Sequence, residues 1–134
     1  MNILVIEDSR FLRIAMERVL ARAGHSVTAV GDGQEGLRAA RSSAPALILL
    51  DMMLPGLDGL GVLKALKQDP STAAVPVIVL TGLSQRNEAK LLSAGASAYI
   101  EKSSLNLEKI GEILLQSVDR VVNGSAPVSI SAAV

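Results

Sequence analysis

Five short apolar runs, separated by segments with helical periodicity, constrain the fold more than any other feature of this sequence. The runs are continuous rather than alternating, as expected for strands covered on both faces. They are ILVI (3–6), VTAV (27–30), ALILL (46–50), VPVIVL (75–80) and AYI (98–100). Strict alternation of strand and helix predicts a parallel sheet with helices on both sides. Right-handed crossovers leave few topologies. At this length we predict an α/β, doubly wound (βα)5 fold, with a five-stranded parallel sheet in the flavodoxin-like order 2-1-3-4-5.

Capping residues and glycines bound the helical segments. Helices are expected over residues 10–22, which end before Gly24, and over 33–43 and 58–68. A fourth helix is expected over 85–94, with Ser84 as its N-cap and Gly95 as its C-terminal stop. The fifth has a clear apolar face, made by Leu107, Ile110, Leu114, Val118 and Val121.

The last dozen residues have a different composition. They read NGSAPVSISAAV and are mostly small, without helical periodicity. A chain of 134 residues is long enough for one domain. We therefore expect a single domain over residues 1–121 and a flexible tail, or the start of a linker, over 122–134.

Charge and composition exclude several kinds of site. Thirteen basic residues balance thirteen acidic ones, which argues against a nucleic-acid-binding arm or a polybasic membrane patch. The sequence has no cysteine, and so no thiol nucleophile or thiolate metal site. No apolar run approaches the roughly 18 residues that a membrane span requires. We therefore expect a cytoplasmic protein that binds neither nucleic acid nor membrane.

Polar residues follow four of the five expected strands. Glu7 and Asp8 follow the first strand, Asp51 the third, Thr81 the fourth and Lys102 the fifth. In such a sheet, ligands bind beyond the carboxyl ends of the strands, so three carboxylates should converge on one crevice. Like charges this close disfavour joint ionisation, so the site needs a cation. Oxygen ligands without sulfur or imidazole point to Mg²⁺, which takes a few carboxylates together with water and phosphate.

This group of residues suggests phosphoryl transfer to Asp51. A carboxylate can attack phosphorus and hold the group as an acyl phosphate. The metal and Lys102 would neutralise the charge that develops on the equatorial phosphoryl oxygens.

The sequence resembles a response-regulator receiver domain of two-component signalling, of the single-domain kind found among chemotaxis regulators, over roughly residues 1–121. The matching motifs are V-I-E-D-S-x-x-x-R at 5–13, L-L-D-x-x-L-P-x-x-D-G at 49–59, V-L-T-G at 79–82, G-A at 95–96 and Y-I-E-K at 99–102. Each motif alone is a weak signal, because short motifs occur by chance. Together, in this order and on the expected elements, they are highly specific.

The resemblance implies that Asp51 accepts a phosphoryl group from the phosphohistidine of a histidine kinase or phosphotransfer protein. It also implies that Asp8 and Asp51 bind Mg²⁺ directly, that Glu7 binds it through water, and that the Met53 backbone carbonyl adds a ligand. The domain would then be a switch, not an enzyme with a separate substrate. It would catalyse only its own phosphorylation and dephosphorylation.

The same resemblance implies how the signal leaves the site. Thr81 and Lys102 would hold the phosphoryl oxygens, and Thr81 and Tyr99 would form the switch. Tyr99 would be an aromatic ring that rotates beneath the output face. A downstream protein would then bind the face made by the fourth helix, fifth strand and fifth helix.

Each of these residues also has a simpler explanation. Glu7 and Asp8 could only favour the positive end of the first helix, with Ser9 capping it. Thr81, Lys102 and Tyr99 are, one by one, ordinary surface or strand residues. Only their joint placement at consecutive strand ends argues for a site.

Two other functions fit the same fold. A pseudo-receiver would dock a partner without being phosphorylated, but it would need a broken acidic pocket, and this pocket is intact. A small flavodoxin-like hydrolase or carrier is the second. An aspartyl phosphatase would need an acid where Met53 stands, and a flavin site would need aromatic rings. The sequence has one Phe, one Tyr and no Trp.

The stretch GDGQEG (31–36) matches the dinucleotide fingerprint G-x-G-x-x-G, but we do not interpret it as one. With Asp32 as N-cap, Glu35 falls at N3 and completes a capping box. The glycines would permit the tight turn before the second helix. In the order 2-1-3-4-5 the second strand is an edge strand, so this loop is expected to lie away from the crevice.

One departure from the family pattern concerns the loop after the fifth strand. Ser103 follows Lys102, where many family members have a proline with a cis bond. A cis bond before Ser costs about 3–4 kcal/mol, so we expect a trans bond.

Overall fold

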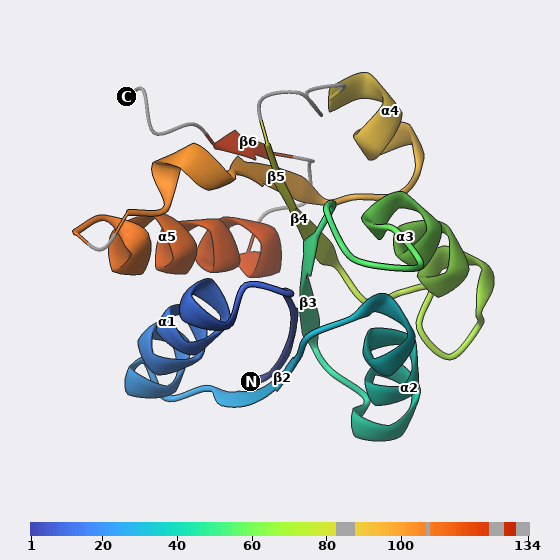
Figure 1. The fold of residues 1–134 in the computed structure, drawn as a ribbon, viewed down its shortest axis with the longest axis horizontal. Coiled ribbons are helices and arrows are strands. Elements are labelled where there is room, and N and C mark those ends of the chain that lie inside the picture. Colours follow the sequence, from blue (N-terminus) through green and yellow to red (C-terminus); the bar gives the residue numbers. More distant parts are fainter. Residues whose placement is uncertain (83–87, 107, 124–127, 131–134) are drawn as a thin grey trace.

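The protein is a parallel sheet between two layers of helices (Figure 1). The computed structural model describes residues 1–82, 88–106, 108–123 and 128–130. Its strands are β1 (Asn2–Ile6), β2 (Ser26–Val30), β3 (Leu47–Asp51), β4 (Val77–Thr81), β5 (Ala98–Glu101) and β6 (Val128–Ile130). They lie in the order β2-β1-β3-β4-β5-β6, and every neighbouring pair is parallel. The expected order 2-1-3-4-5 is therefore confirmed for the first five strands.

The helices divide between the two faces of the sheet. They are α1 (Arg10–Arg22), α2 (Gly33–Ser43), α3 (Gly59–Gln68), α4 (Glu88–Ser93) and α5 (Ile110–Asn123), with a short 3₁₀ turn, η2 (Lys102–Ser104). In Figure 1, α1 and α5 lie side by side on one face, and α2, α3 and α4 cover the other. Within the described ranges, none of the helices has the length and hydrophobicity of a transmembrane span.

The continuous apolar runs are explained by the two cores that they fill. Successive strand residues point to opposite faces, so alternate residues of one run enter different cores. In β1, Ile3 and Val5 pack towards α1 and α5, whereas Leu4 and Ile6 pack towards α2 and α3. All five residues of β3 and of β4 are buried. A strand buried on both faces has no reason to alternate with polar residues.

The helix ends follow the capping signals where the structure describes them. Ser9 Oγ accepts the Leu12 N–H at 3.3 Å, and Asp58 Oδ1 accepts the Gly61 N–H at 2.8 Å. Gly95 has a φ of 110° and follows α4 closely, as expected for a helix stop. The expected start of that helix, including Ser84 as its N-cap, lies outside the described residues. The peptide bond before Ser103 is trans, as expected, since no bond in the described part is cis.

Where the structure describes the segment expected as a flexible tail over 122–134, that segment has regular secondary structure. Helix α5 runs to Asn123, past the expected boundary at residue 121, and Val128–Ile130 forms β6. This strand lies parallel to β5, with Tyr99 opposite Ser129. An edge strand leaves a row of N–H and C=O groups unpaired. The crossover through α5 returns the chain to the open edge of β5. Residues 128–130 can therefore form hydrogen bonds with part of that row.

The GDGQEG turn caps a helix, as expected, but its glycines have another role. Asp32 Oδ1 accepts the Glu35 N–H at 2.8 Å. None of the three glycines has the positive φ of a strained turn; among the described glycines only Gly24, Gly56 and Gly95 do. Instead they allow close packing, because a Cβ on Gly36 would lie 2.5 Å from Cδ1 of Ile6. The expectation that they serve the turn conformation was wrong.

Candidate functional site

Asp51 is the centre of the candidate site. It is the last residue of β3 and its side chain is fully buried. Its Oδ1 accepts the backbone N–H of Met53 at 3.0 Å, and Oδ2 lies 3.1 Å from the Lys102 Nζ. A buried carboxylate is stable only when it is paired and hydrogen-bonded, and both oxygens of Asp51 meet that condition.

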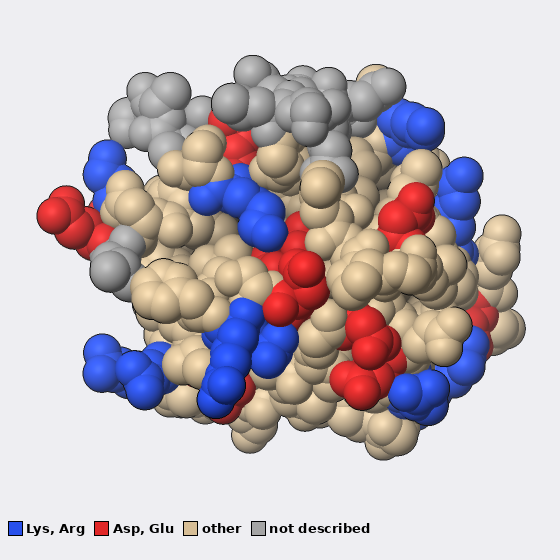
Figure 2. Space-filling view, in the orientation of Figure 1, with Lys and Arg blue, Asp and Glu red and all other residues tan. Residues whose placement is uncertain are grey.

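The acidic pair after β1 lies beside Asp51. The Glu7 N–H continues the pairing with β2 by donating to the Val30 carbonyl at 3.0 Å. This turns the Glu7 side chain inward, where it is fully buried, whereas Asp8 is exposed. One carboxylate oxygen from each of Glu7, Asp8 and Asp51 lies within 4.8 Å of the others. The three carboxylates therefore converge as the strand ends predicted, and acidic side chains gather near the middle of the face in Figure 2.

Lys102 bridges the two buried acids. It follows β5, and its Nζ lies 3.2 Å from Glu7 Oε1 and 3.1 Å from Asp51 Oδ2. Burial alone would lower the pKa of Lys102. The hydrogen bond to Asp51 and the negative charges of Glu7 and Asp51 outweigh burial, so the pKa of Lys102 is raised.

One lysine does not balance this cluster. Burial and the nearby Asp51 carboxylate raise the pKa of Glu7 to about 7, against the opposing effects of the Ser9 N–H and Lys102. In the described part of the chain Glu7 Oε1 accepts no hydrogen bond, although Lys102 is its ion-pair partner. The raised pKa of Glu7 means that its ionised form has too little positive charge nearby. The exposed Asp8 is a further acid in the same cluster. The oxygen donors therefore fit a hard divalent cation such as Mg²⁺.

Thr81 brings a hydroxyl to the same edge of the sheet. It is the last residue of β4, one position beyond Leu80, which pairs with Asp51. Its Oγ1 is buried and has no hydrogen-bond partner among the residues that the structure describes. Buried hydroxyls are nearly always paired, so an orphan at this position can serve a ligand oxygen.

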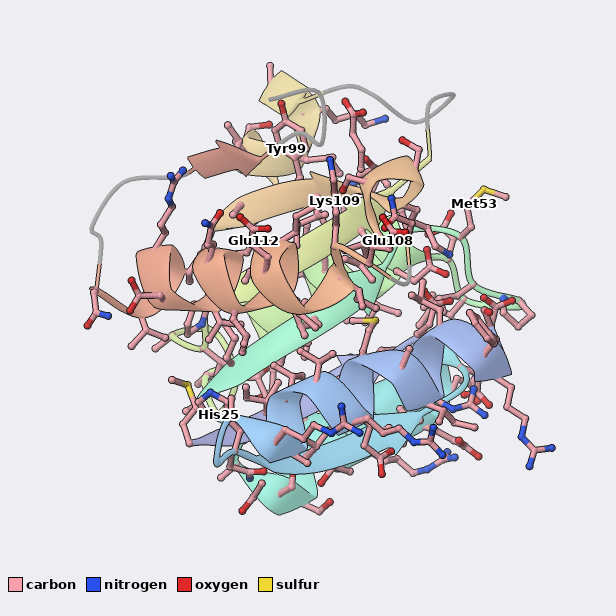
Figure 3. All side chains as sticks on the ribbon, turned by 90° about the vertical axis from the view of Figure 1, so that its left-hand side faces the viewer. His25, Met53, Tyr99, Glu108, Lys109 and Glu112 are labelled. Carbon is pink, nitrogen blue, oxygen red and sulfur yellow. The ribbon has the colours of Figure 1, made fainter. Side chains whose placement is uncertain are left out.

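Met53 and Tyr99 have different surroundings. The Met53 side chain is 58% exposed and points away from the molecule in Figure 3, while its N–H is bound to Asp51. Tyr99 is 5% exposed and packs with Leu91 and Ala96 in the core that faces α4. In this structure the Tyr99 ring therefore lies beneath the surface formed by α4 and β5.

Sequence reasoning missed three contacts around the acids. Backbone N–H groups of Ser9 and Met53 bind Glu7 Oε2 and Asp51 Oδ1, both at 3.0 Å. The Arg13 guanidinium donates to the Glu7 carbonyl at 2.9 Å. Arg13 is part of the motif V-I-E-D-S-x-x-x-R, but nothing in the motif indicates which atoms it contacts.

Comparison with known proteins gives consistent matches. The family model for the response regulator receiver domain matches residues 3–114. The chain is 34% identical over 122 residues to the gliding motility regulatory protein of Myxococcus xanthus, covering 90% of this chain and 15% of that protein. It is 41% identical over 102 residues to the transcriptional regulatory protein CseB of Streptomyces avermitilis, covering 75% and 42%. The chain thus spans less than half the length of these relatives.

Solved structures agree with the sequence matches. The chemotaxis response regulator CheY4 of Vibrio cholerae aligns with a TM-score of 0.79 and 26% identity, covering 90% of this chain and 97% of that one. The receiver domain of a sensor histidine kinase from Pseudomonas aeruginosa aligns with a TM-score of 0.78 and 29% identity, covering 92% and 98%. That structure is described with a magnesium ion coordinated in its active site cleft.

Proposed function

The chain belongs to the response regulator receiver domain family, and from this premise we propose that Asp51 accepts a phosphoryl group from a partner's phosphohistidine. The partner is a histidine kinase or a phosphotransfer protein of a two-component system. The observation that carries the proposal is the buried Asp51 carboxylate, paired with Lys102 and flanked by Glu7 and Asp8. The transfer breaks the bond between phosphorus and the donor's imidazole nitrogen and forms a bond between phosphorus and an Asp51 oxygen.

The other residues of the site each have one task in this transfer. The Lys102 ammonium pairs with Asp51 in the resting site, and it can follow the negative charge onto the phosphoryl oxygens. The unpaired Thr81 hydroxyl can donate to one of these oxygens. Mg²⁺, when bound, would supply positive charge that offsets the negative charge of the phosphoryl oxygens. Asp8 and Asp51 would hold it directly, Glu7 through water, and Met53 through its backbone carbonyl.

Asp8 should contribute more to Mg²⁺ affinity than Glu7. Asp8 is the exposed acid of the cluster, free to turn towards a cation, whereas Glu7 is buried against Lys102. We expect Asp8→Asn to weaken Mg²⁺ binding more than about 10-fold, because it removes a direct ligand, and Glu7→Gln to weaken it less. Calorimetric titration at pH 8 measures both. Equal losses in the two variants would contradict the ranking.

Mg²⁺ binding should also weaken as the pH falls from 8 to 6. The pKa of Glu7 is raised to about 7 in the metal-free protein, so Glu7 takes up a proton in this range. Metal binding favours the deprotonated carboxylate, and protonation therefore competes with it. In Glu7→Gln the affinity should change much less between pH 8 and 6. The idea is wrong if the variant keeps the full pH dependence of the wild type.

We further propose that phosphorylation changes the face formed by α4, β5 and α5, where a downstream protein would bind. A phosphoryl oxygen that binds Thr81 would draw its hydroxyl towards Asp51. Tyr99 can then move into the vacated space, a local two-state change with an effect at the surface. Because Tyr99 lies in the core beside α4, its movement would reach that helix.

This switch predicts a specific pattern of amide NMR shifts. With a beryllium fluoride phosphoryl mimic and Mg²⁺, we expect shifts at residues 88–110 as well as at 7–10 and 51–58. Thr81→Val is the matched control, since it keeps the shape and removes the hydroxyl. It should keep the shifts near Asp51 and lose those at 88–110. Shifts confined to 7–10 and 51–58 in the wild type would exclude the switch.

A further inference from the structure

Arg13 contacts the main chain of the acidic pair rather than its side chains. Its Nη1 donates to the Glu7 carbonyl at 2.9 Å and lies 3.4 Å from the Asp8 carbonyl. Arg13 belongs to the first turns of α1 and is partly buried. One rigid guanidinium thus meets two successive carbonyls of the segment that carries both acids.

Arg13 completes a support on both sides of Glu7. On one side the Glu7 N–H is fixed to β2 by the Val30 carbonyl at 3.0 Å. On the other side the Glu7 carbonyl is held by Arg13. Beyond Glu7 the chain leaves the sheet, and Asp8 has no strand partner in the pairing of β1 with β2. Arg13 therefore holds the main chain where the sheet no longer does.

Gly31 leaves the space that the Arg13 guanidinium occupies. A Cβ at this position would lie 3.0 Å from Arg13 Nη1 and 3.8 Å from its Cζ. The first glycine of GDGQEG therefore adjoins the support of the acidic pair, although we expected the loop to lie away from the crevice. A methyl group there would meet only the far end of a flexible side chain, so it would displace the guanidinium without moving the backbone.

Arg13 acts on the acidic pair through its backbone. Among the described residues, its guanidinium hydrogen-bonds the carbonyl oxygens of Glu7 and Asp8 and not their carboxylate oxygens. Its contact therefore acts on the position of the chain. Groups outside the direct ligand set typically change metal affinity by orienting the ligands.

We infer that Arg13 is a positioning residue that fixes the Glu7–Asp8 main chain for cation binding, and that Gly31 leaves the space it needs. This inference rests on the proposed Mg²⁺ site. It assigns a role to the arginine of the first motif and to a glycine that the phosphoryl chemistry does not use. Neither residue touches the phosphoryl group.

The test is a double-variant cycle on Mg²⁺ affinity. We expect Arg13→Ala to weaken Mg²⁺ binding about 10-fold, at the lower end of the effect of groups that orient ligands. Gly31→Ala should weaken it in the same direction, with a thermal stability close to that of the wild type. In the Arg13→Ala background, Gly31→Ala should have no further effect, because no guanidinium remains to be displaced. Arg18→Ala, which removes an exposed arginine of the same helix, should bind Mg²⁺ as the wild type does.

A second measurement needs no metal. The backbone carbonyl ¹³C shifts of Glu7 and Asp8 in the metal-free protein should change in Arg13→Ala and Gly31→Ala, but not in Arg18→Ala. The inference is overturned if both single variants keep the wild-type affinity and carbonyl shifts. It is also overturned if Gly31→Ala weakens binding equally with and without Arg13. A wild-type protein that binds no Mg²⁺ would instead refute the proposed function, while the carbonyl shifts would still report on the Arg13 contact.

Discussion

Asp51→Asn should abolish phosphorylation of the protein by acetyl phosphate and Mg²⁺ while leaving the fold intact. An amide lacks the nucleophilic carboxylate oxygen that an acyl phosphate requires. The Asn oxygen can still accept the Met53 N–H that Asp51 Oδ1 accepts. The substitution also removes the negative charge of one of two buried acids, since Glu7 and Asp51 are both fully buried and share Lys102. The loss should therefore be complete for phosphorylation and small for stability.

Intact-protein mass spectrometry measures this directly, as the gain of one phosphoryl group in the wild type. The absence of tryptophan makes the usual fluorescence measurement impractical. Asp58→Asn is the matched control, because Asp58 is an exposed acid of the next loop that caps α3 through Gly61. Asn also caps helices well, so this variant should fold and be phosphorylated. A phosphoryl group that appears on another residue of Asp51→Asn would show that the assignment is wrong.

The parallel sheet could be predicted because it depends on local patterns, and the length of the chain favoured its strand order among the few that right-handed crossovers allow. Each apolar run is a strand covered by helices on both faces, and each helix between two runs forces a parallel crossover. The convergence of Glu7, Asp8 and Asp51 followed from the same reasoning, since the carboxyl ends of parallel strands meet at one edge. No atomic detail was needed for either step.

The contacts that hold the acids could not be predicted from the sequence, because they join residues that only the folded chain brings together. Arg13 and Gly31 are 18 positions apart, and the pairing of β1 with β2 and the packing of α1 on β2 bring them together. The same letters, G-x-G-x-x-G, fit a tight turn, a phosphate loop or a close approach of helix and strand. Packing decides between these, as the side chain of Ile6 against Gly36 shows. The strand β6 depends likewise on the open edge of β5, which lies 30 residues earlier in the chain.

Gly59→Ala should be strongly destabilising because the added Cβ would clash with main-chain atoms at the end of β3. A Cβ on Gly59 would lie 2.3 Å from the Met52 Cα and 2.5 Å from the Asp51 carbonyl oxygen. The Gly59 N–H also donates to the Met52 carbonyl at 3.1 Å, so the start of α3 is fixed to the end of β3. Relief of the clash would push α3 away from the strand end that carries the phosphorylation site proposed above.

The expected cost is about 3 kcal/mol, at the upper end of the usual cost of overpacking. For a domain of this size it corresponds to a fall in melting temperature on the order of 10 °C. Gly111→Ala is the matched control. Gly111 lies in α5, and its Cβ would meet nothing closer than 4.0 Å. Gly111 is the second residue of α5, and alanine has a higher helix propensity than glycine, so this variant should be at least as stable as the wild type.

Circular dichroism during heating measures both variants, and mass spectrometry at a temperature where each is folded measures phosphorylation. In Gly59→Ala the folded protein should also be phosphorylated more slowly, because α3 and the residues before it no longer pack against the end of β3 that carries Asp51. In Gly111→Ala the rate should be that of the wild type. If Gly59→Ala melts within about 2 °C of the wild type, then α3 can shift freely, and the end of β3 does not depend on this contact.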